Sequence, residues 1–380
     1  MEENRFVILG AGVIGLSLAY ELSGRGARVL LVERGEPGRA TSWAGAGILS
    51  PAGLGGERRP LDLLRAHSLR ILERWSQELK DATGIDNELH RCGSLRLAWT
   101  PEEAEVLDRA ARDWSAQGIV VEEVSPRELP ALEPRLAPGL ARVYRLPGEA
   151  QVRNPRHLQA LLAGCRQRGV EVRQGAEVSG LVTDGDRIAS VEIDGERLPG
   201  TTFVVTSGAW SSSLLSWVGV DLTVRPVRGQ IVLLRAPAPP FQHVLWEGSR
   251  YLVPRRDGRV LIGSTEEEAG FAAHPTAGGV AELIRFACRI VPSLAEIPFE
   301  RAWAGLRPGS HDGLPYLGPL SGWKNLYVAS GHFRYGFELA AGTALLLSEV
   351  LLGETPTLPL EPFRPDRLGA PASRRLTNSS

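Results

Sequence analysis

Two glycine-rich stretches, far apart in the sequence, have the residue types and spacing to bind phosphates or other anions. The first, GAGVIG at positions 10–15, has its glycines where a dinucleotide-binding turn needs them. Gly10 permits a tight turn, Gly12 lets the backbone approach a pyrophosphate, and Gly15 allows the following helix to pack closely. Glu33, about 18 residues after Gly15, is placed to accept hydrogen bonds from ribose hydroxyls and disfavours the 2′-phosphate of NADP. We expect a dinucleotide site here; the alternative is a glycine-rich turn of an ordinary α/β domain.

The second stretch, SGHFRYGF at positions 330–337, follows an apolar strand and precedes an apolar helix. It predicts a second anion site, because a helix amino terminus presents unpaired N–H groups and a partial positive charge. Between the two stretches, residues 38–51 are mostly small and include the hydroxyls of Thr41 and Ser42. Small side chains let the backbone lie against a ligand and hydroxyls bind phosphate, although a flexible surface loop has the same composition.

The elements that must position these turns follow a βαβ pattern. An apolar strand at 6–9 leads into the first turn and its helix, and a second strand at 28–33 ends in Glu33. Residues 203–210 are typical of an apolar strand that ends in a small-residue turn around Gly208. Ligands of α/β sheets bind beyond the carboxyl ends of parallel strands, so Gly208 is expected at the ligand site.

The remaining sequence alternates between short strands and capped helices, and its length of 380 residues predicts two intertwined domains. Strands are expected at 93–99, 170–172 and 226–234, with a hairpin at 251–263 that turns at 257–258. Helices are expected at 61–79, after Thr100-Pro101, after Ser125-Pro126, from Asn154-Pro155 to about Arg168, and at 280–291.

Composition favours a small-molecule partner. The net charge is −1, with 43 basic and 44 acidic residues, so no field attracts nucleic acid or an anionic membrane. Three scattered cysteines, Cys92, Cys165 and Cys288, suggest neither a disulfide framework nor a metal site. The first four residues lack a basic leader pattern and no apolar run reaches ~18 residues, so we expect a cytoplasmic protein without a membrane span. Residues 369–380 are expected to be a disordered tail.

From Arg5 to about Arg367 the chain resembles the FAD-dependent amino-acid oxidases, and within that family the glycine oxidases of thiamine biosynthesis. The stretches that carry the resemblance are 10–15, 41–49, 303–308, 312–318 and 331–336. It implies an α/β fold with a Rossmann-type, glutathione-reductase-like FAD-binding domain and an inserted mixed antiparallel β-sheet substrate domain. The implied FAD-binding domain comprises residues 1–88, 148–222 and 302–368, and the substrate domain comprises 89–147 and 223–301.

The resemblance also implies where non-covalent FAD is held. The turn and acid of the first stretch would hold the ADP half, the small-residue run would contact flavin and pyrophosphate, and Val178 would contact adenine. The last stretch would lie beneath the flavin, where a helix amino end stabilises the negative charge of the reduced ring. With Gly208 from its own turn, the expected cofactor residues are Gly10, Gly12, Val13, Ile14, Gly15, Glu33, Arg34, Thr41, Ser42, Ala46, Gly47, Ile48, Val178, Gly208, His332, Phe333, Arg334, Tyr335, Gly336, Phe337 and Glu338.

Three residues match substrate-binding positions of the family. Arg307, in the sequence Leu-Arg-Pro, would hold the substrate carboxylate through two parallel hydrogen bonds. The hydroxyl of Tyr251 would donate to the same carboxylate, and Arg334 would lie in the same pocket. The alternatives are a structural ion pair for Arg307, a core aromatic for Tyr251 and a cofactor contact for Arg334. His332 is expected to contact the cofactor through its backbone and not to act as a base.

The implied reaction is oxidative deamination of glycine, another small amino acid or a secondary amine, by hydride transfer to the flavin. Its products are a 2-oxo acid, ammonia or an amine, and hydrogen peroxide formed from dioxygen. The alternative is a D-amino acid or proline dehydrogenase that passes electrons to a quinone or a partner flavin; an RNA-modifying flavoprotein and a non-catalytic nucleotide-binding module are other classes. The family also implies a homo-oligomer, by analogy a tetramer.

Two positions depart from the family pattern. Glu266 stands where the glycine oxidases have an apolar methionine, and Tyr335 stands where an asparagine is usual before the glycine. A carboxylate near the pocket attracts an amine or repels an acid, so Glu266 bears directly on the substrate range.

Overall fold

The computed structural model describes residues 5–53 and 59–368, so the tail expected at 369–380 lies outside the described residues. A six-stranded sheet forms one half of the molecule, with the strand order β18-β19-β12-β1-β2-β8. All its neighbouring strands are parallel except β18 and β19. The strands are β1 (Arg5–Leu9), β2 (Arg28–Glu33), β8 (Glu171–Gln174), β12 (Thr202–Val205), β18 (Tyr316–Pro319) and β19 (Leu326–Ser330).

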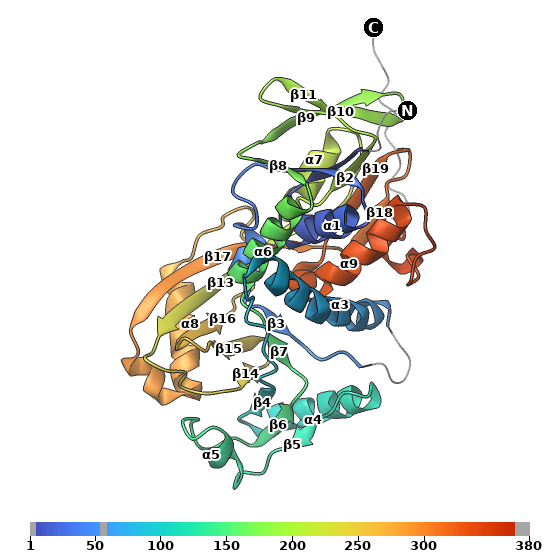
Figure 1. Cartoon of the computed structure of the whole chain (residues 1–380). Helices are drawn as coiled ribbons and strands as arrows, with labels where there is room; N and C mark the ends of the chain where they lie inside the picture. The colour runs from blue at the N-terminus through green and yellow to red at the C-terminus, as the bar shows by residue number, and fades with distance from the viewer. Residues whose placement is uncertain (1–4, 54–58, 369–380) are drawn as a thin grey trace.

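Both faces of this sheet are buried, which explains the continuous apolar runs of its strands. Because side chains alternate along a strand, Phe6 and Ile8 of β1 pack into one core, whereas Val7 and Leu9 pack into another. Helices cover the first face, and a three-stranded sheet with a short helix covers the second (Figure 1). The helices of the first face are α1 (Val13–Gly24), α3 (Pro60–Thr83), α6 (Asn154–Gln167) and α9 (Gly336–Leu351); the second face carries β9 (Val178–Asp184), β10 (Arg187–Ile193), β11 (Glu196–Pro199) and α7 (Ser211–Ser216).

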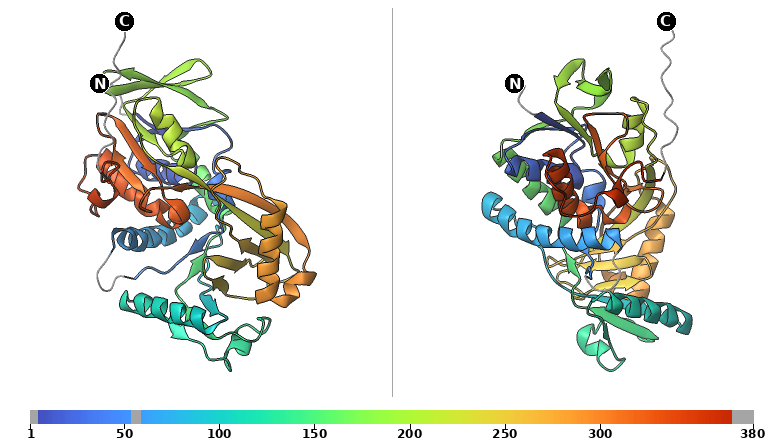
Figure 2. Two further views of the ribbon diagram at one scale, coloured as in Figure 1. Left: turned by 180° about the vertical axis from the view of Figure 1, so that it is seen from behind. Right: turned by 90° about the vertical axis from the view of Figure 1, so that its right-hand side faces the viewer.

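An eight-stranded mixed sheet, in the order β17-β13-β16-β15-β14-β4-β6-β5, forms the other half. Figure 2 shows this half below the six-stranded sheet in two further views. Among the described residues of this sheet, β14 and β4 pair in parallel and the other neighbouring strands are antiparallel. Helix α8 (Ala277–Ile290) packs on one face, and the other face carries a small apolar cluster that includes Tyr251. The strands are β4 (Ser94–Ala98), β5 (Glu122–Glu123), β6 (Arg142–Leu146), β13 (Arg225–Arg235), β14 (Val244–Glu247), β15 (Arg250–Pro254), β16 (Arg259–Gly263) and β17 (Phe299–Gly309).

The expected fold class, a Rossmann-type sheet with an inserted antiparallel sheet, is confirmed. Strand β17 crosses the domain boundary expected between residues 301 and 302, because it pairs with β13 along its whole length. We keep the two-domain division as a proposal with this strand shared between the halves. In the segments 5–53 and 59–368, no helix is both long enough and apolar enough to cross a bilayer.

The two helices expected after Thr100-Pro101 and Ser125-Pro126 both begin with capping hydrogen bonds but differ in length. Thr100 and Glu103 form the expected capping box at the start of α4 (Pro101–Ala116). Ser125 and Glu128 also exchange capping hydrogen bonds, but α5 (Leu129–Leu132) has only four residues. It ends there because the next residue precedes Pro134, and a residue before proline disfavours the helical conformation.

Candidate active site

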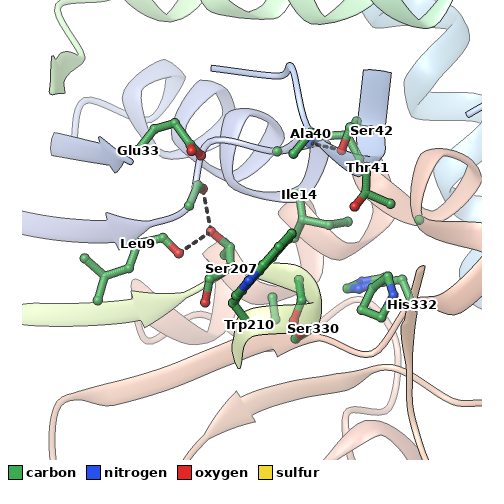
Figure 3. Close-up of a pocket in the computed structure, with 18 of the residues that line it drawn as sticks. Leu9, Ile14, Glu33, Ala40, Thr41, Ser42, Ser207, Trp210, Ser330 and His332 are labelled. Atoms are coloured by element: carbon green, nitrogen blue, oxygen red, sulfur yellow. Dashed lines mark hydrogen bonds between the residues drawn. The ribbon is translucent and has the colours of Figure 1, made fainter. Parts of the chain in front are cut away.

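A cavity of ≈ 330 Å³ lies beyond the carboxyl ends of β1, β2, β12 and β19. Its place is the point where the strand order changes direction, with β2 on one side of β1 and β12 on the other. In the close-up, Glu33 lies at one end and His332 at the other, with Ile14 and Trp210 between them (Figure 3). The expected site residues that line it are Gly10, Gly12, Val13, Ile14, Glu33, Arg34, Thr41, Ser42, Val178, Gly208, Arg307, His332, Phe333, Arg334, Gly336 and Phe337.

Hydrogen bonds from the backbone to two side chains stabilise the glycine turn. Glu33 accepts hydrogen bonds from the N–H of Ala11 at 2.8 Å and of Gly35 at 3.0 Å, and Ser42 accepts one from the N–H of Val13 at 2.9 Å. A carboxylate has about four acceptor positions, so Glu33 keeps capacity for a ribose. Gly10 has a φ of +113°, and a Cβ there would lie 2.8 Å from the carbonyl oxygen of Thr206. Only glycine fits this turn.

Residues Ala46, Gly47 and Ile48 lie behind the cavity wall and are not among its lining residues. The carbonyl of Ala46 accepts a hydrogen bond from Arg255 at 2.7 Å, and that of Gly47 accepts one from the N–H of Val152 at 2.8 Å. Ile48 forms β3 (Ile48–Leu49) against β7 (Ala150–Gln151). A direct contact of these three residues with a cofactor stays a prediction, as does one of Gly15, which packs against the carbonyl of Gly10.

Asn154 lines the cavity, although the sequence patterns did not identify it as a site residue. Its Nδ2 donates to the carbonyl oxygen of Ser42 at 3.0 Å, while its Oδ1 is buried and has no partner among the described residues. The Asn-Pro pair predicted only a helix start, yet the structure makes Arg153 the N-cap, without a side-chain cap bond. This oxygen is shielded from the cavity and lies against Gly47, so the side chain of Asn154 joins the start of α6 to the segment around residues 42–47.

The turn after β12 supplies a second residue that the expectations did not include, Trp210. Its ring lies under the guanidinium of Arg34, with 4.0 Å between the guanidinium carbon and the ring centroid. The turn itself is held to β19, because Ser211 donates to Ser330 at 2.8 Å and Ser330 donates to the carbonyl of Gly208 at 3.0 Å. The small-residue turn thus lines the cavity, and Trp210 is the last residue of that turn.

At the other end of the cavity, β19 turns into α9 through Gly331 and Phe333, with φ values of +79° and +48°. His332 is buried, and burial lowers its pKa to about 3. Its Nε2 lies 3.1 Å from the hydroxyl of Thr343. The imidazole is therefore too weak a base to hold a proton at ordinary pH, and its contact with Thr343 ties it to α9, which agrees with a structural role.

Two residues of this stretch, Tyr335 and Glu338, do not line the cavity. The side chain of Glu338 accepts a hydrogen bond from the N–H of Ser50 at 3.0 Å and pairs with Arg65 of α3 at 3.1 Å. The guanidinium of Arg65 also lies over the Tyr335 ring, 4.6 Å from its centroid. These side chains join α9 to α3, so any cofactor contact they make would come from their backbone.

Arg307 reaches the cavity from β17. Its guanidinium donates to the hydroxyl of Ser264 at 2.7 Å and to the carbonyl of Thr265 at 3.1 Å. It lies against the backbone of Gly229, where any side chain would collide with it. Within residues 5–53 and 59–368 no carboxylate forms an ion pair with it, which disfavours the structural ion-pair interpretation.

Burial lowers the pKa of the Arg307 guanidinium, and an electrostatic interaction with Tyr251 opposes this shift. Tyr251 is buried in the apolar cluster of the second sheet and does not line the cavity. Its ring packs edge-on against Trp246, with centroids 5.1 Å apart. The structure thus places Tyr251 near Arg307 but gives it the packing of a core aromatic as well, so its contact with a substrate stays a prediction.

Arg334, the third expected substrate residue, lines the cavity together with Arg307. Its guanidinium forms an ion pair with Glu266, the residue that departs from the family pattern. The three cysteines are free thiols outside the cavity lining, and burial raises the pKa of Cys165 to about 12. In the part of the chain that the structure describes, no thiolate is therefore placed to bond a cofactor.

Comparison with known proteins agrees with this geometry. The model of the FAD dependent oxidoreductase family matches residues 5–350. The glycine oxidase of Pseudomonas aeruginosa is 38% identical over 365 residues, which cover 95% of this chain and 98% of that protein. The match therefore includes both sheets and the residues that line the cavity.

Two solved structures are also similar. The crystal structure of glycine oxidase from Geobacillus kaustophilus aligns with a TM-score of 0.90 at 34% identity, covering 95% of this chain and 98% of that one. The structure of iminodiacetate oxidase from Chelativorans aligns with a TM-score of 0.87 at 28% identity, covering 95% and 99%. The chain belongs to the family of FAD-dependent oxidoreductases, in which it is an FAD enzyme of the amino-acid oxidase type.

Proposed function

We propose that this enzyme oxidises glycine, or an amino acid or secondary amine of similar size, and uses dioxygen as the electron acceptor. The observation that carries the proposal is Arg307, a half-buried cation on the cavity wall that has no carboxylate partner among the described residues. Burying a charge without a partner is costly, so such a group fits a site that receives an anion from solution. The carboxylate of an amino acid supplies that anion.

The residues that line the cavity are the ones that would hold FAD. The turn at Gly10–Gly15 and the carboxylate of Glu33 would hold the pyrophosphate and adenosine ribose, with Val178 and Trp210 nearby. The amino end of α9 would lie at the flavin, where its partial positive charge favours the anionic reduced ring.

FAD, when bound, would supply the two-electron acceptor for the hydride of the substrate Cα, with dioxygen as the final oxidant. The planar guanidinium of Arg307 can grip the substrate carboxylate through two parallel hydrogen bonds and so fix the Cα. His332 would not accept a proton from the amine, because burial lowers its pKa to about 3 and its Nε2 lies 3.1 Å from the hydroxyl of Thr343. The amine must therefore arrive neutral, and glycine would give glyoxylate, ammonia and hydrogen peroxide.

An anaerobic flavin-bleaching screen tests the proposal. The holoenzyme is mixed with glycine, sarcosine, D-alanine, D-proline or L-proline, and reduction is followed in the visible flavin spectrum. We expect glycine or sarcosine to bleach the flavin fastest. Stoichiometric peroxide release in air then separates an oxidase from a dehydrogenase that uses a quinone or a partner flavin. A flavin that no amine reduces would contradict the proposal.

Four further properties remain proposals that rest on the family resemblance. FAD is bound without a covalent link, which acid precipitation tests by releasing it into the supernatant. The protein acts in the cytoplasm and is a homo-oligomer, by analogy a tetramer, which light scattering tests. A place in thiamine biosynthesis is also proposed, on the same resemblance.

A further inference from the structure

Two guanidinium groups belong to residues that line the cavity, and they differ in whether a carboxylate pairs with them. Arg307 bonds uncharged oxygens, from Ser264 and Thr265 among others, and has no carboxylate partner in the described chain. Arg334 also lines the cavity, but Glu266 neutralises it in an ion pair. One cation is therefore available to a substrate carboxylate, and the other is already paired.

A single segment, residues 264–267, sets both states. Ser264 and Thr265 are buried and accept the two closest hydrogen bonds of Arg307. The next residue, Glu266, carries the carboxylate that pairs with Arg334. A substrate held at Arg307 would thus lie beside the same segment that holds the second cation.

This segment is anchored by Glu267, whose carboxylate lies in a different network. Glu267 accepts hydrogen bonds from the hydroxyl of Thr265 and, at 2.7 Å, from the side-chain amide of Gln230, and it forms an ion pair with Arg228. The backbone N–H of Gln230 also donates to the hydroxyl of Thr265 at 2.9 Å. The residues on both sides of Glu266 are therefore held by contacts other than the ion pair of Glu266 with Arg334.

The pair of Glu266 and Arg334 contributes little to folding stability. Their side chains are 44% and 27% exposed, and pairs of such exposure are screened by water. The ion pair instead affects which ligands bind. The carboxylate of Glu266 would repel a second carboxylate on a ligand, and that carboxylate would have to displace Glu266 from Arg334.

We propose that Glu266 restricts the substrate to amino acids and amines with a single carboxylate, by occupying the cation that would otherwise bind a second one. This inference rests on the proposed function, because it takes Arg307 as the site of the first carboxylate. An uncharged residue at position 266 would leave Arg334 without this carboxylate partner. The site could then bind dicarboxylates such as iminodiacetate.

Two unreactive ligands of equal chain length test this without turnover. Diglycolate has two carboxylates, and ethoxyacetate has a methyl group in place of one of them. Titration calorimetry on the holoenzyme gives the ratio of their dissociation constants. We expect the wild type to prefer ethoxyacetate, and Glu266→Gln to shift the ratio at least tenfold toward diglycolate.

Two further variants make the test specific. Glu268→Gln removes the same charge two residues away, where the carboxylate pairs with Arg225 at 3.1 Å on the surface, and should move the ratio less than twofold. In the double variant Glu266→Gln/Arg334→Met, the shift of the ratio toward diglycolate should be lost. An unchanged ratio in Glu266→Gln, an equal shift in Glu268→Gln, or a gain that survives the loss of Arg334 would each overturn the inference.

The same experiment distinguishes this inference from the proposed function. Dissociation constants are measured without any amine being oxidised, so a holoenzyme that glycine fails to reduce contradicts the proposed reaction alone. With a working oxidase, the rate of flavin reduction by iminodiacetate relative to sarcosine should rise in Glu266→Gln and stay at the wild-type value in Glu268→Gln.

Discussion

The guanidinium of Arg34 lies over the indole ring of Trp210, 4.0 Å from the ring centroid. Arg34 directly follows β2, Trp210 ends the turn after β12, and β1 lies between these two strands. The contact therefore spans the carboxyl end of β1 on the cavity wall, beside the glycine turn. An aromatic face and a cation at this place form a surface suited to a planar heterocycle.

The first prediction is that Trp210→Ala weakens FAD binding without unfolding the protein. Stacking of a base on an aromatic ring is worth about 1–3 kcal/mol, so the dissociation constant for FAD should rise roughly tenfold to a hundredfold. Fluorescence titration of the apoprotein with FAD measures it. Trp114→Ala is the control, because that ring also contacts an arginine, Arg96 at 5.4 Å, but does not line the cavity. Equal dissociation constants in the two variants would contradict the prediction.

The second prediction concerns Arg307. Arg307→Ala should raise the Michaelis constant for glycine by about a hundredfold or more and leave the visible spectrum of the bound flavin unchanged, because a charge-assisted pair in a half-buried site is lost. Arg307→Lys keeps the charge but loses the planar fork, so its effect should be intermediate. Arg225→Ala, on the neighbouring strand and exposed, is the matched control. Unchanged kinetics in Arg307→Ala would remove Arg307 from the site.

The sequence predicted most of the scaffold because its strongest patterns are local. The glycine spacing, the apolar run and the terminal acid of β1, α1 and β2 specify one supersecondary unit, and both faces of β1 are buried as its apolar residues require. The capping box at Thr100 was likewise readable from four adjacent residues. Such features need no knowledge of distant parts of the chain.

The rest could not be predicted because it depends on contacts between distant residues. Asn154 has the sequence context of a helix start, and only the fold shows that its amide bonds the carbonyl of Ser42. Glu266 could be identified as a departure, but its partner Arg334 is 68 residues away. Glu338 was expected at the cofactor, whereas its side chain is paired with Arg65 of another helix.

The third prediction separates the two interpretations of Tyr251. A hydroxyl that donates to a carboxylate is worth about 1.5–3 kcal/mol, so Tyr251→Phe should raise the dissociation constant of glycolate roughly tenfold to a hundredfold. The ring would keep its packing against Trp246 and beside Gly263, where a Cβ would lie 2.6 Å from the phenol oxygen. The melting temperature should therefore stay within about a degree of wild type. Unchanged glycolate binding would leave Tyr251 as a core aromatic only.

The fourth prediction is a loss of stability in mild acid that depends on His157. This residue is buried, its Nδ1 lies 3.0 Å from the side-chain nitrogen of Asn87, and burial lowers its pKa to about 4. The unfolded chain binds a proton near pH 6.5 and the folded one does not, so the contribution is complete above pH 6.5 and is lost as the pH falls toward 4. Each pH unit in this window costs about 1.4 kcal/mol of unfolding free energy.

Because buried His332 acts in the same direction, the test compares variants and not absolute values. Urea unfolding of the holoenzyme at pH 7.5 and 5.5, with excess FAD at both, gives the difference in unfolding free energy. His157→Gln should reduce that difference by roughly 1 kcal/mol, since one proton-linked term is removed. His274→Gln changes an exposed side chain and should reproduce the wild-type difference. If His157→Gln also reproduced it, the proton uptake that destabilises the protein in acid would lie at another group.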